Sequence, residues 1–143
     1  SLGEVDLNGI MQSPIVAVGS DGQVMNPERD SAENVHPRSY GTFPRVLGRF
    51  VREKGLIPLE LAVYKMSGLP AKILRLPERG RITAGFKADI TVFDPATVRD
   101  RADFTNPHQY PAGIPHVFVN GTAAVKDSRL TGAGRGEILR KKR

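Results

Sequence analysis

The chain has 143 residues, of which 39% are hydrophobic and 25% charged, a mix typical of one globular domain or of one domain with part of another. It contains no cysteine, which excludes disulfides and thiolate zinc sites and favours a cytoplasmic location. The net charge of +6 arises mainly in the last nine residues, and the chain lacks the interleaved basic and aromatic residues typical of nucleic-acid binding. No apolar run is long enough to span a membrane, and the first residues lack the pattern of a signal peptide.

The first strong signal along the chain is a predicted strand. Residues 1–13 before it form an undefined N-terminal segment. The run Ile15–Ser20 is short, apolar and β-branched, a composition typical of strands that are buried on both faces of a parallel sheet. Asp21 follows at the C-terminal end of this strand. Residues 23–41 are then predicted to form a long polar loop, of the kind that is usually functional or disordered.

Three helices are predicted after this loop. Apolar residues at helical spacing predict a first helix that is capped by Thr42, carries Pro44 in its first turn and ends at Gly55. The second runs from Pro58 to Gly68, and a short third one covers residues 70–76. The predicted order up to this point is therefore strand, loop and helices.

The remaining residues, 80–143, have the pattern of a small β unit that ends in a basic tail. The stretch Ala88–Asp94 is predicted to form a strand. The dipeptide Asn120-Gly121 is the strongest hairpin signal in the sequence, and it predicts a pair of strands between His116 and Val125. Residues 14–79 and residues 80–143 therefore belong to different classes, α/β followed by β.

Four stretches of the sequence resemble one enzyme family. Gly80–Asp94 resembles the strand-turn-strand near the C-terminus of many amidohydrolases. Three further stretches resemble the N-acyl-D-amino-acid deacylases, or D-aminoacylases, of that superfamily: Val18–Gly22, His36–Gly48 and Asn106–Gly121. The resemblance implies a (β/α)8 barrel beside a small β-sandwich. The first region would supply the last barrel strand, the active-site loop and helices of an incomplete barrel, and the second region part of the sandwich, in which Ile82, Ile90 and Val92 are expected to be buried.

The same resemblance implies a zinc-dependent hydrolase. Members of this family are expected to hydrolyse the N-acyl amide bond of N-acyl-D-amino acids by means of a metal-activated water. A barrel of this type needs at least about 200 residues, and the histidine pair and other metal ligands of the family have no counterpart in this chain. The chain alone is therefore expected to be inactive and without stoichiometric zinc. It is expected to self-associate or to require the missing N-terminal portion, from a longer protein or a separate chain.

Asp21 is the leading candidate for catalysis. Carried over from the family, its carboxylate contacts the metal, takes the proton from the activated water and delivers it to the leaving nitrogen. The alternative is an aspartate of a Ser-Asp-Gly turn that is satisfied by its own backbone. Placement after a strand buried on both faces favours the functional interpretation, because barrel enzymes keep their chemistry at that end of the strands.

Other polar residues have weaker assignments. In one interpretation His36 lines the mouth of the active site on the substrate side. In the other it is a loop histidine that holds Arg38 or a backbone carbonyl. It is not expected to bind the metal. Arg38 and Arg45 have the guanidinium geometry for a substrate carboxylate, although structural ion pairs are the preferred assignment. The remaining candidates are assigned to turns or to the loop and hairpin of the β unit: Asp89, Asp94, His108 and His116.

Two alternatives to a D-amino-acid deacylase remain open. The complete protein could be another amide hydrolase of the same superfamily, although the stretch His36–Gly48 favours the deacylase branch. The isolated chain could instead be a non-catalytic β module or interaction subunit in which Asp21 has no catalytic role. Metal content and hydrolysis by the purified chain distinguish the second alternative from the deacylase.

Overall fold

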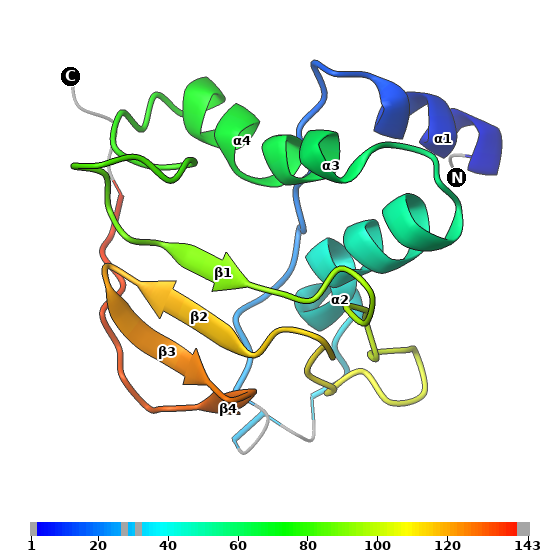
Figure 1. The fold of residues 1–143 in the computed structure, drawn as a ribbon. Helices are drawn as coiled ribbons and strands as arrows, with labels where there is room; N and C mark the ends of the chain where they lie inside the picture. Colours follow the sequence, from blue (N-terminus) through cyan, green and yellow to red (C-terminus); the bar gives the residue numbers. More distant parts are fainter. Residues whose placement is uncertain (1–2, 27–28, 31–32, 140–143) are drawn as a thin grey trace.

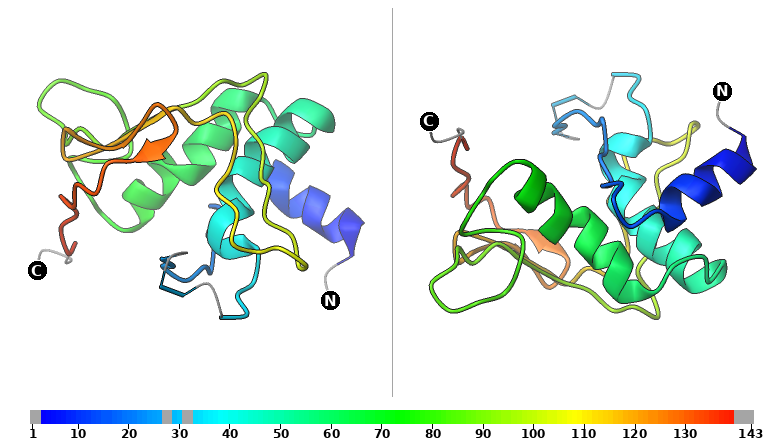
Figure 2. Two further views of the ribbon diagram at one scale, coloured as in Figure 1. Left: turned by 90° about the horizontal axis from the view of Figure 1, so that it is seen from below. Right: turned by 90° about the horizontal axis from the view of Figure 1, so that it is seen from above.

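The computed structural model describes residues 3–26, 29–30 and 33–139. The helices lie on one side of the molecule and a small antiparallel sheet lies on the other (Figure 1). The helices are α1 (Glu4–Gln12), α2 (Arg38–Arg45), the π-helix η1 (Val46–Glu53), α3 (Leu59–Met66) and α4 (Gly68–Ile73). The strands are β1 (Ile90–Val92), β2 (His116–Val119), β3 (Thr122–Lys126) and β4 (Arg129–Leu130). Viewed from above, α3 and α4 lie across the sheet, with α1 at the far end of the molecule (Figure 2). Every helix in these described ranges is too short or too polar to serve as a membrane span.

The sheet confirms the predicted hairpin. Its strands follow the chain order β1-β2-β3-β4, and each pairs with the next in antiparallel direction. The turn between β2 and β3 places Asn120 at φ 48° and Gly121 at φ 79°. Two consecutive positive φ angles are the requirement of a type I′ turn, which Asn-Gly satisfies at little steric cost. Local chemistry alone therefore determines this part of the fold.

The first predicted helix begins earlier and is less regular than the sequence pattern indicates. The prediction of a start at Thr42 is wrong, because Pro37 is the N-cap and α2 begins at Arg38. Pro44 consequently lies inside the helix, where it has no N–H to donate to the carbonyl of Tyr40. The helix widens directly afterwards into the π-helix η1, and Lys54 N–H donates to the Arg49 carbonyl at 2.9 Å.

A further helix, α1, lies in the segment that the sequence pattern leaves undefined. The Gly3 N–H donates to the Asp6 carboxylate at 3.1 Å, which satisfies a free donor at the start of the helix. Met11 is buried near its end, whereas Val5 is 84% exposed. This irregular apolar pattern gives no clear helical face, so amphipathic spacing could not identify the helix.

The predicted strand at Ile15–Ser20 does not form in this chain. Pro14 and Ile15 lie in a turn, no strand is assigned up to Ser20, and Ile15 is 81% exposed. The segment is held instead at Val18, whose N–H donates to the Lys65 carbonyl at the end of α3, at 3.0 Å. A strand buried on both faces depends on neighbouring strands and covering helices, and the described residues place no strand beside this segment.

The β region forms one sheet rather than two stacked sheets in the part of the chain that the structure describes. Ile82 is 83% exposed and Val92 41% exposed, so the expectation that they are buried in a sandwich is wrong for this chain. An apolar groove of about 1050 Å³ lies between the helices α3 and α4 and the sheet. Its lining includes Leu59, Val63, Ile90, Phe93 and Ile114. A single sheet leaves this apolar surface without the second layer that a sandwich requires.

The core joins the helices to the loop after β1. Its buried residues are Met11, Val46, Leu47, Phe50, Ile57, Ala62 and Val98. Val98 is fully buried, and the Arg52 guanidinium donates to its carbonyl at 2.6 Å. The backbone of Gly113, at φ 77°, lies so close to Val98 that a Cβ there would be 2.5 Å from Val98 Cα. The loop therefore packs on the helical layer as an integral part of the core.

Lys65 is an ionisable residue in the interior of this fold. It is 0% exposed, and its ammonium donates to the carbonyl of Ser13. Burial lowers the pKa of Lys65 from its ordinary value of 10.5, because an apolar environment disfavours the charged form. Between the lowered pKa and the ordinary value the unfolded chain binds more protons than the folded chain, so this residue adds stability as pH rises through that interval.

Replacing Lys65 with methionine is expected to remove this pH dependence. The free energy of unfolding, measured with urea, should therefore increase for the wild type relative to that of Lys65→Met as pH is raised towards about 10. Lys72 is exposed on α4, so Lys72→Met should follow the wild type across the same range. Parallel curves for wild type and Lys65→Met would show that the ammonium is not buried in solution.

Candidate functional site

Asp21 lies in an irregular segment with its side chain open to solvent. Its φ is 49°, a left-handed conformation that aspartate tolerates better than most residues. The Gly22 N–H donates to the Ser20 hydroxyl at 3.2 Å, so the turn is stabilised by Ser20 rather than by Asp21. The side chain of Asp21 is 85% exposed. It is thus available to bind a ligand, and its catalytic role stays a prediction.

The turn is seated on the first residues of α2. A Cβ at Gly22 would meet the Cα of Ser39 at 2.9 Å, so only glycine allows the two backbones to approach this closely. The Gln23 N–H donates to the Ser39 hydroxyl at 3.1 Å. These contacts fix Asp21 relative to the start of the helix, although the segment before it is not a strand.

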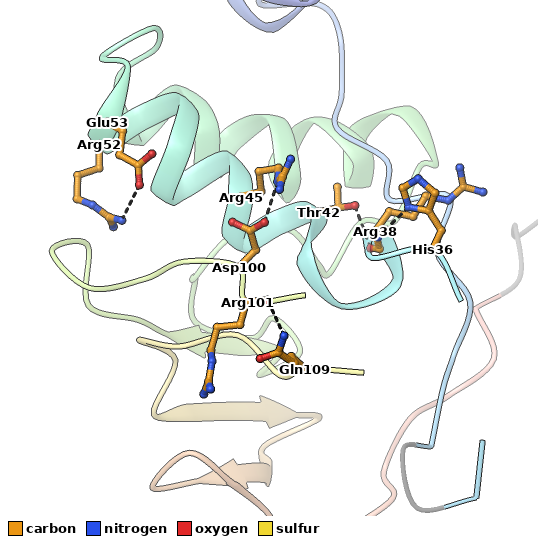
Figure 3. Close-up of polar contacts among 9 residues, drawn as sticks. All are labelled: His36, Arg38, Thr42, Arg45, Arg52, Glu53, Asp100, Arg101 and Gln109. Carbon is orange, nitrogen blue, oxygen red and sulfur yellow. Dashed lines mark hydrogen bonds and ion pairs between the residues drawn. The ribbon is translucent and has the colours of Figure 1, made fainter. Parts of the chain in front are cut away.

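Arg38 is brought directly to Asp21. Its Nη2 atom lies 2.9 Å from Asp21 Oδ2, and its backbone N–H donates to His36 Nδ1 at 3.1 Å. The Thr42 hydroxyl donates to the Arg38 carbonyl at 3.0 Å (Figure 3). Both partners of the ion pair are largely exposed, and exposed ion pairs contribute little to stability. Another charged group can therefore displace either partner at small cost.

His36 lies beside these two residues, and among the described residues it belongs to no group that could bind a metal. Its ring contacts the edge of Phe104, with 5.0 Å between the ring centroids and 78° between the planes. Its Nδ1 atom accepts the Arg38 N–H, which leaves Nε2 as the ring nitrogen open to a substrate. The structure thus brings Asp21, Arg38 and His36 to one place.

Three other acidic or basic candidates have structural roles, as the preferred assignments predict. Arg45 Nε donates to Asp100 Oδ2 at 2.8 Å and ties α2 to the loop after β1 (Figure 3). Asp94 accepts the Ala96 N–H at 2.9 Å and the Thr97 hydroxyl at 2.8 Å, and these bonds lower the pKa of Asp94. Asp89 accepts the Asn120 N–H at 2.8 Å.

The two other histidines differ in their surroundings. His116 lies in β2, and its Nδ1 accepts the Asp127 N–H at 3.3 Å, in agreement with its assignment to the hairpin. The assignment of His108 to the loop of the β unit is incomplete, because its ring contacts the loop before α2. His108 Nδ1 lies 3.1 Å from the Tyr40 hydroxyl, and Nε2 lies 2.9 Å from the Glu33 carbonyl. Neither partner is near His108 in the sequence, so no local pattern could have identified these contacts.

The residues described do not by themselves assemble a metal centre. No group of three or more histidine, cysteine, aspartate or glutamate side chains within residues 3–26, 29–30 and 33–139 could hold a metal ion. Asp21 can contribute one carboxylate oxygen, a common ligand type for zinc. Any metal that uses Asp21 therefore needs further ligands from elsewhere.

Comparison with known proteins identifies close relatives over nearly the whole chain. The chain is 45% identical over 136 residues to a D-aminoacylase of Alcaligenes xylosoxydans xylosoxydans, which corresponds to 95% of this chain and 27% of the relative. It superimposes on a solved D-aminoacylase structure, from work on a binuclear metal centre, with a TM-score of 0.83 and 46% identity over 92% of this chain and 27% of the other. The N-acyl-D-glutamate deacylase of Bordetella bronchiseptica, solved with zinc and a phosphonate inhibitor, gives a TM-score of 0.77 and 41% identity over 90% of this chain and 27% of the other.

These relatives are hydrolases of carbon–nitrogen bonds, and this chain spans about a quarter of the length of each. The family model described as amidohydrolase family matches residues 7–125. That match includes α1 from Leu7 onwards, the segment that carries Asp21, the other helices and the sheet as far as Val125 in β3. With the family model covering most of its residues and close relatives aligned along them, the chain belongs to the amidohydrolase family.

Proposed function

We propose that this chain is the C-terminal part of a metal-dependent N-acyl-D-amino-acid deacylase, to which it contributes Asp21. The observation that carries the proposal is the 45% identity to a D-aminoacylase over 95% of the chain, together with the exposed Asp21 beside Arg38. The reaction is hydrolysis of the amide bond between the acyl group and the D-amino acid. The substrate-side residues are Arg38 and His36.

A bound metal ion, zinc in this proposal, would lower the pKa of a water towards about 7. Asp21 is expected to act as one ligand and as the base of the reaction. Its carboxylate can hold the proton once Arg38, which contacts Oδ2 in this structure, has moved to another partner. The proton then passes to the nitrogen of the leaving amino acid, which departs as a neutral amine instead of an anion.

Arg38 suits the recognition of the negatively charged product and substrate. A guanidinium matches a carboxylate with two parallel hydrogen bonds, and the α-carboxylate is common to all N-acyl amino acids. Because the exposed pair with Asp21 is weak, Arg38 can exchange that partner for the substrate carboxylate when Asp21 engages the metal. His36 lies on the same side of Asp21 through its hydrogen bond with the Arg38 backbone.

The other metal ligands and the rest of the barrel are expected to come from an N-terminal portion of the protein. The apolar groove of about 1050 Å³ supports this part of the proposal, because a large apolar surface marks a site of association. The exposed apolar residues Ile15 and Ile82 support it as well. A second copy of this chain is the alternative occupant of these surfaces.

The test compares the 143-residue chain alone with the same chain joined to the upstream part of a D-aminoacylase relative. Zinc is measured by atomic absorption, and hydrolysis is measured with N-acetyl-D-methionine and its L-enantiomer. We expect no stoichiometric zinc and no turnover for the chain alone, since one carboxylate cannot form a zinc site that needs three or four ligands. The joined protein should bind zinc and cleave only the D-enantiomer.

Stoichiometric zinc together with turnover by the chain alone would contradict the assignment of the missing ligands. A joined protein that folds and binds zinc but cleaves no N-acyl-D-amino acid would contradict the assignment of the reaction. Light scattering on the chain alone identifies the alternative occupant, because a dimer shows that copies of this chain cover the apolar surfaces.

A further inference from the structure

The ring of His108 connects two segments that are far apart in the sequence. Nε2 lies 2.9 Å from the carbonyl oxygen of Glu33, and Nδ1 lies 3.1 Å from the hydroxyl of Tyr40 on α2. A carbonyl oxygen can only accept, so Nε2 carries a proton and donates to Glu33. The Tyr40 hydroxyl donates to Nδ1 when that nitrogen is unprotonated, and the contact with Glu33 requires the proton at Nε2 in either charge state of the ring.

Tyr40 is suited to remain the donor in this arrangement. Burial raises the pKa of the Tyr40 hydroxyl, and Tyr110 and Asp30 act in the same direction. The rings of Tyr40 and His108 meet edge to face, with centroids 5.7 Å apart. The ring of Tyr110 contacts Tyr40 in a similar way. The hydroxyl therefore stays protonated at neutral pH and its direction is fixed by packing.

The loop that carries His108 is itself held by a network of hydrogen bonds. The Gln109 amide donates to the Arg101 carbonyl at 2.8 Å (Figure 3). It also donates to the Asn106 carbonyl at 3.0 Å. Asp103 accepts the backbone N–H groups of Thr105 and Asn106 at 2.8 and 2.6 Å. The loop is thus a fixed support for a side chain that reaches across to the opposite segment.

The same loop contacts the candidate site at a second point. Phe104 packs against the ring of His36, while His108 holds Glu33, three residues before His36. Tyr40 lies two residues after Arg38 on the first turn of α2. The loop thereby holds the segment that leads to His36 and Arg38 at two points.

We propose that His108 and Tyr40 are positioning residues, which hold the segment from Glu33 to Arg38 in place so that His36 and Arg38 face the substrate. This inference rests on the proposed function, in which those two residues lie on the substrate side of Asp21. Neither His108 nor Tyr40 touches the reacting atoms. Their loss is therefore expected to weaken substrate binding rather than the chemical step.

The structural test uses the 143-residue chain and three variants. His108→Phe keeps an aromatic ring and removes both hydrogen bonds, and Tyr40→Phe removes only the hydroxyl. His116→Phe is the matched control in β2. Long-range proton–nitrogen correlation spectra of the wild type should show the His108 ring protonated at Nε2. The Arg38 amide should exchange with solvent about tenfold faster in His108→Phe, which loses two hydrogen bonds, and about threefold faster in Tyr40→Phe, which loses one.

The functional test uses the same variants in the zinc-loaded joined protein. KM for N-acetyl-D-methionine should rise about tenfold in His108→Phe and about threefold in Tyr40→Phe, with kcat within about twofold of wild type. His116→Phe should change neither constant. A His108 ring protonated only at Nδ1, or unchanged Arg38 exchange in both variants, would overturn the positioning role. So would a fall in kcat at constant KM.

The two tests separate the failure of this inference from the failure of the proposed function. If the joined wild type hydrolyses no N-acyl-D-amino acid, the proposed function fails, and the tautomer and exchange measurements still decide whether His108 holds the segment. If the wild type is active and every variant that folds leaves both KM and Arg38 exchange unchanged, only the positioning role fails. Tyr40→Phe provides this answer even if His108→Phe does not fold.

Discussion

Asp21→Asn in the joined, zinc-loaded protein is expected to lower kcat for N-acetyl-D-methionine by about 10²–10⁴-fold, the usual contribution of general acid–base catalysis. Asparagine keeps the size of the side chain and its tolerance for φ 49°, but it cannot accept the proton of the attacking water. Proton transfer takes place in the transition state, so the loss should fall mainly on kcat and less on KM. Steady-state kinetics at saturating zinc measure both constants.

The matched control for this variant is Asp89→Asn. Asp89 accepts the Asn120 N–H and pairs with Arg79 in the β region, so its replacement should lower stability more than rate. Circular dichroism verifies that both variants are folded before their kinetics are compared. Near-normal kcat in a folded Asp21→Asn protein would mean that Asp21 only forms the turn.

Gly113→Ala is expected to lower the free energy of unfolding by about 2–5 kcal/mol. A left-handed backbone costs a non-glycine residue roughly 1–2 kcal/mol, and overpacking a filled core costs typically a further 1–3 kcal/mol. The new methyl group would lie 2.5 Å from both Cα and N of Val98. The backbone cannot move away easily, because the Gly113 carbonyl accepts the Asp94 N–H at 2.9 Å and Ala112 bridges to Arg99.

Gly85→Ala separates the two contributions. Gly85 has φ 84°, and a Cβ there would meet nothing within 4 Å. This substitution carries only the backbone cost, about 1–2 kcal/mol. Urea denaturation of both variants yields the two free energies of unfolding. Equal losses at the two glycines would show that the contact between Gly113 and Val98 is loose in solution.

The parts of the fold that depend on local chemistry could be predicted from the sequence. Asn120-Gly121 makes the required turn by itself, and the helix α3 follows the apolar spacing after Pro58. The residue at which a helix begins was less predictable. Both Pro37 and Thr42 are acceptable N-terminal residues for α2, and the observed helix has Pro37 as its N-cap. The strand at Ile15–Ser20 could not form from local preference, because strands of this composition are stabilised by neighbours.

The candidate site was predictable in its residues more than in its geometry. The motifs identified Asp21, His36 and Arg38, and the structure brings the three together. The pairing of Arg38 with Asp21 was not predicted, since the preferred assignment of Arg38 named no partner. The hydrogen bond between His108 and the Glu33 carbonyl joins residues 75 positions apart. It depends on how the loop after β1 packs against α2. No periodicity or spacing in the sequence encodes such a contact.

The left-handed turn at Asp21 also bears on how an enzyme of this kind can lose its activity over time. Few residues other than glycine, asparagine and aspartate occupy φ 49° comfortably, and Gly22 beside it is confined by the Cα of Ser39. Asparagine is separated from aspartate by a single nucleotide substitution and satisfies the same backbone requirement. Under the proposed function, a change of Asp21 to asparagine therefore gives a protein that folds but no longer turns over substrate. Selection on folding alone would not remove such a variant.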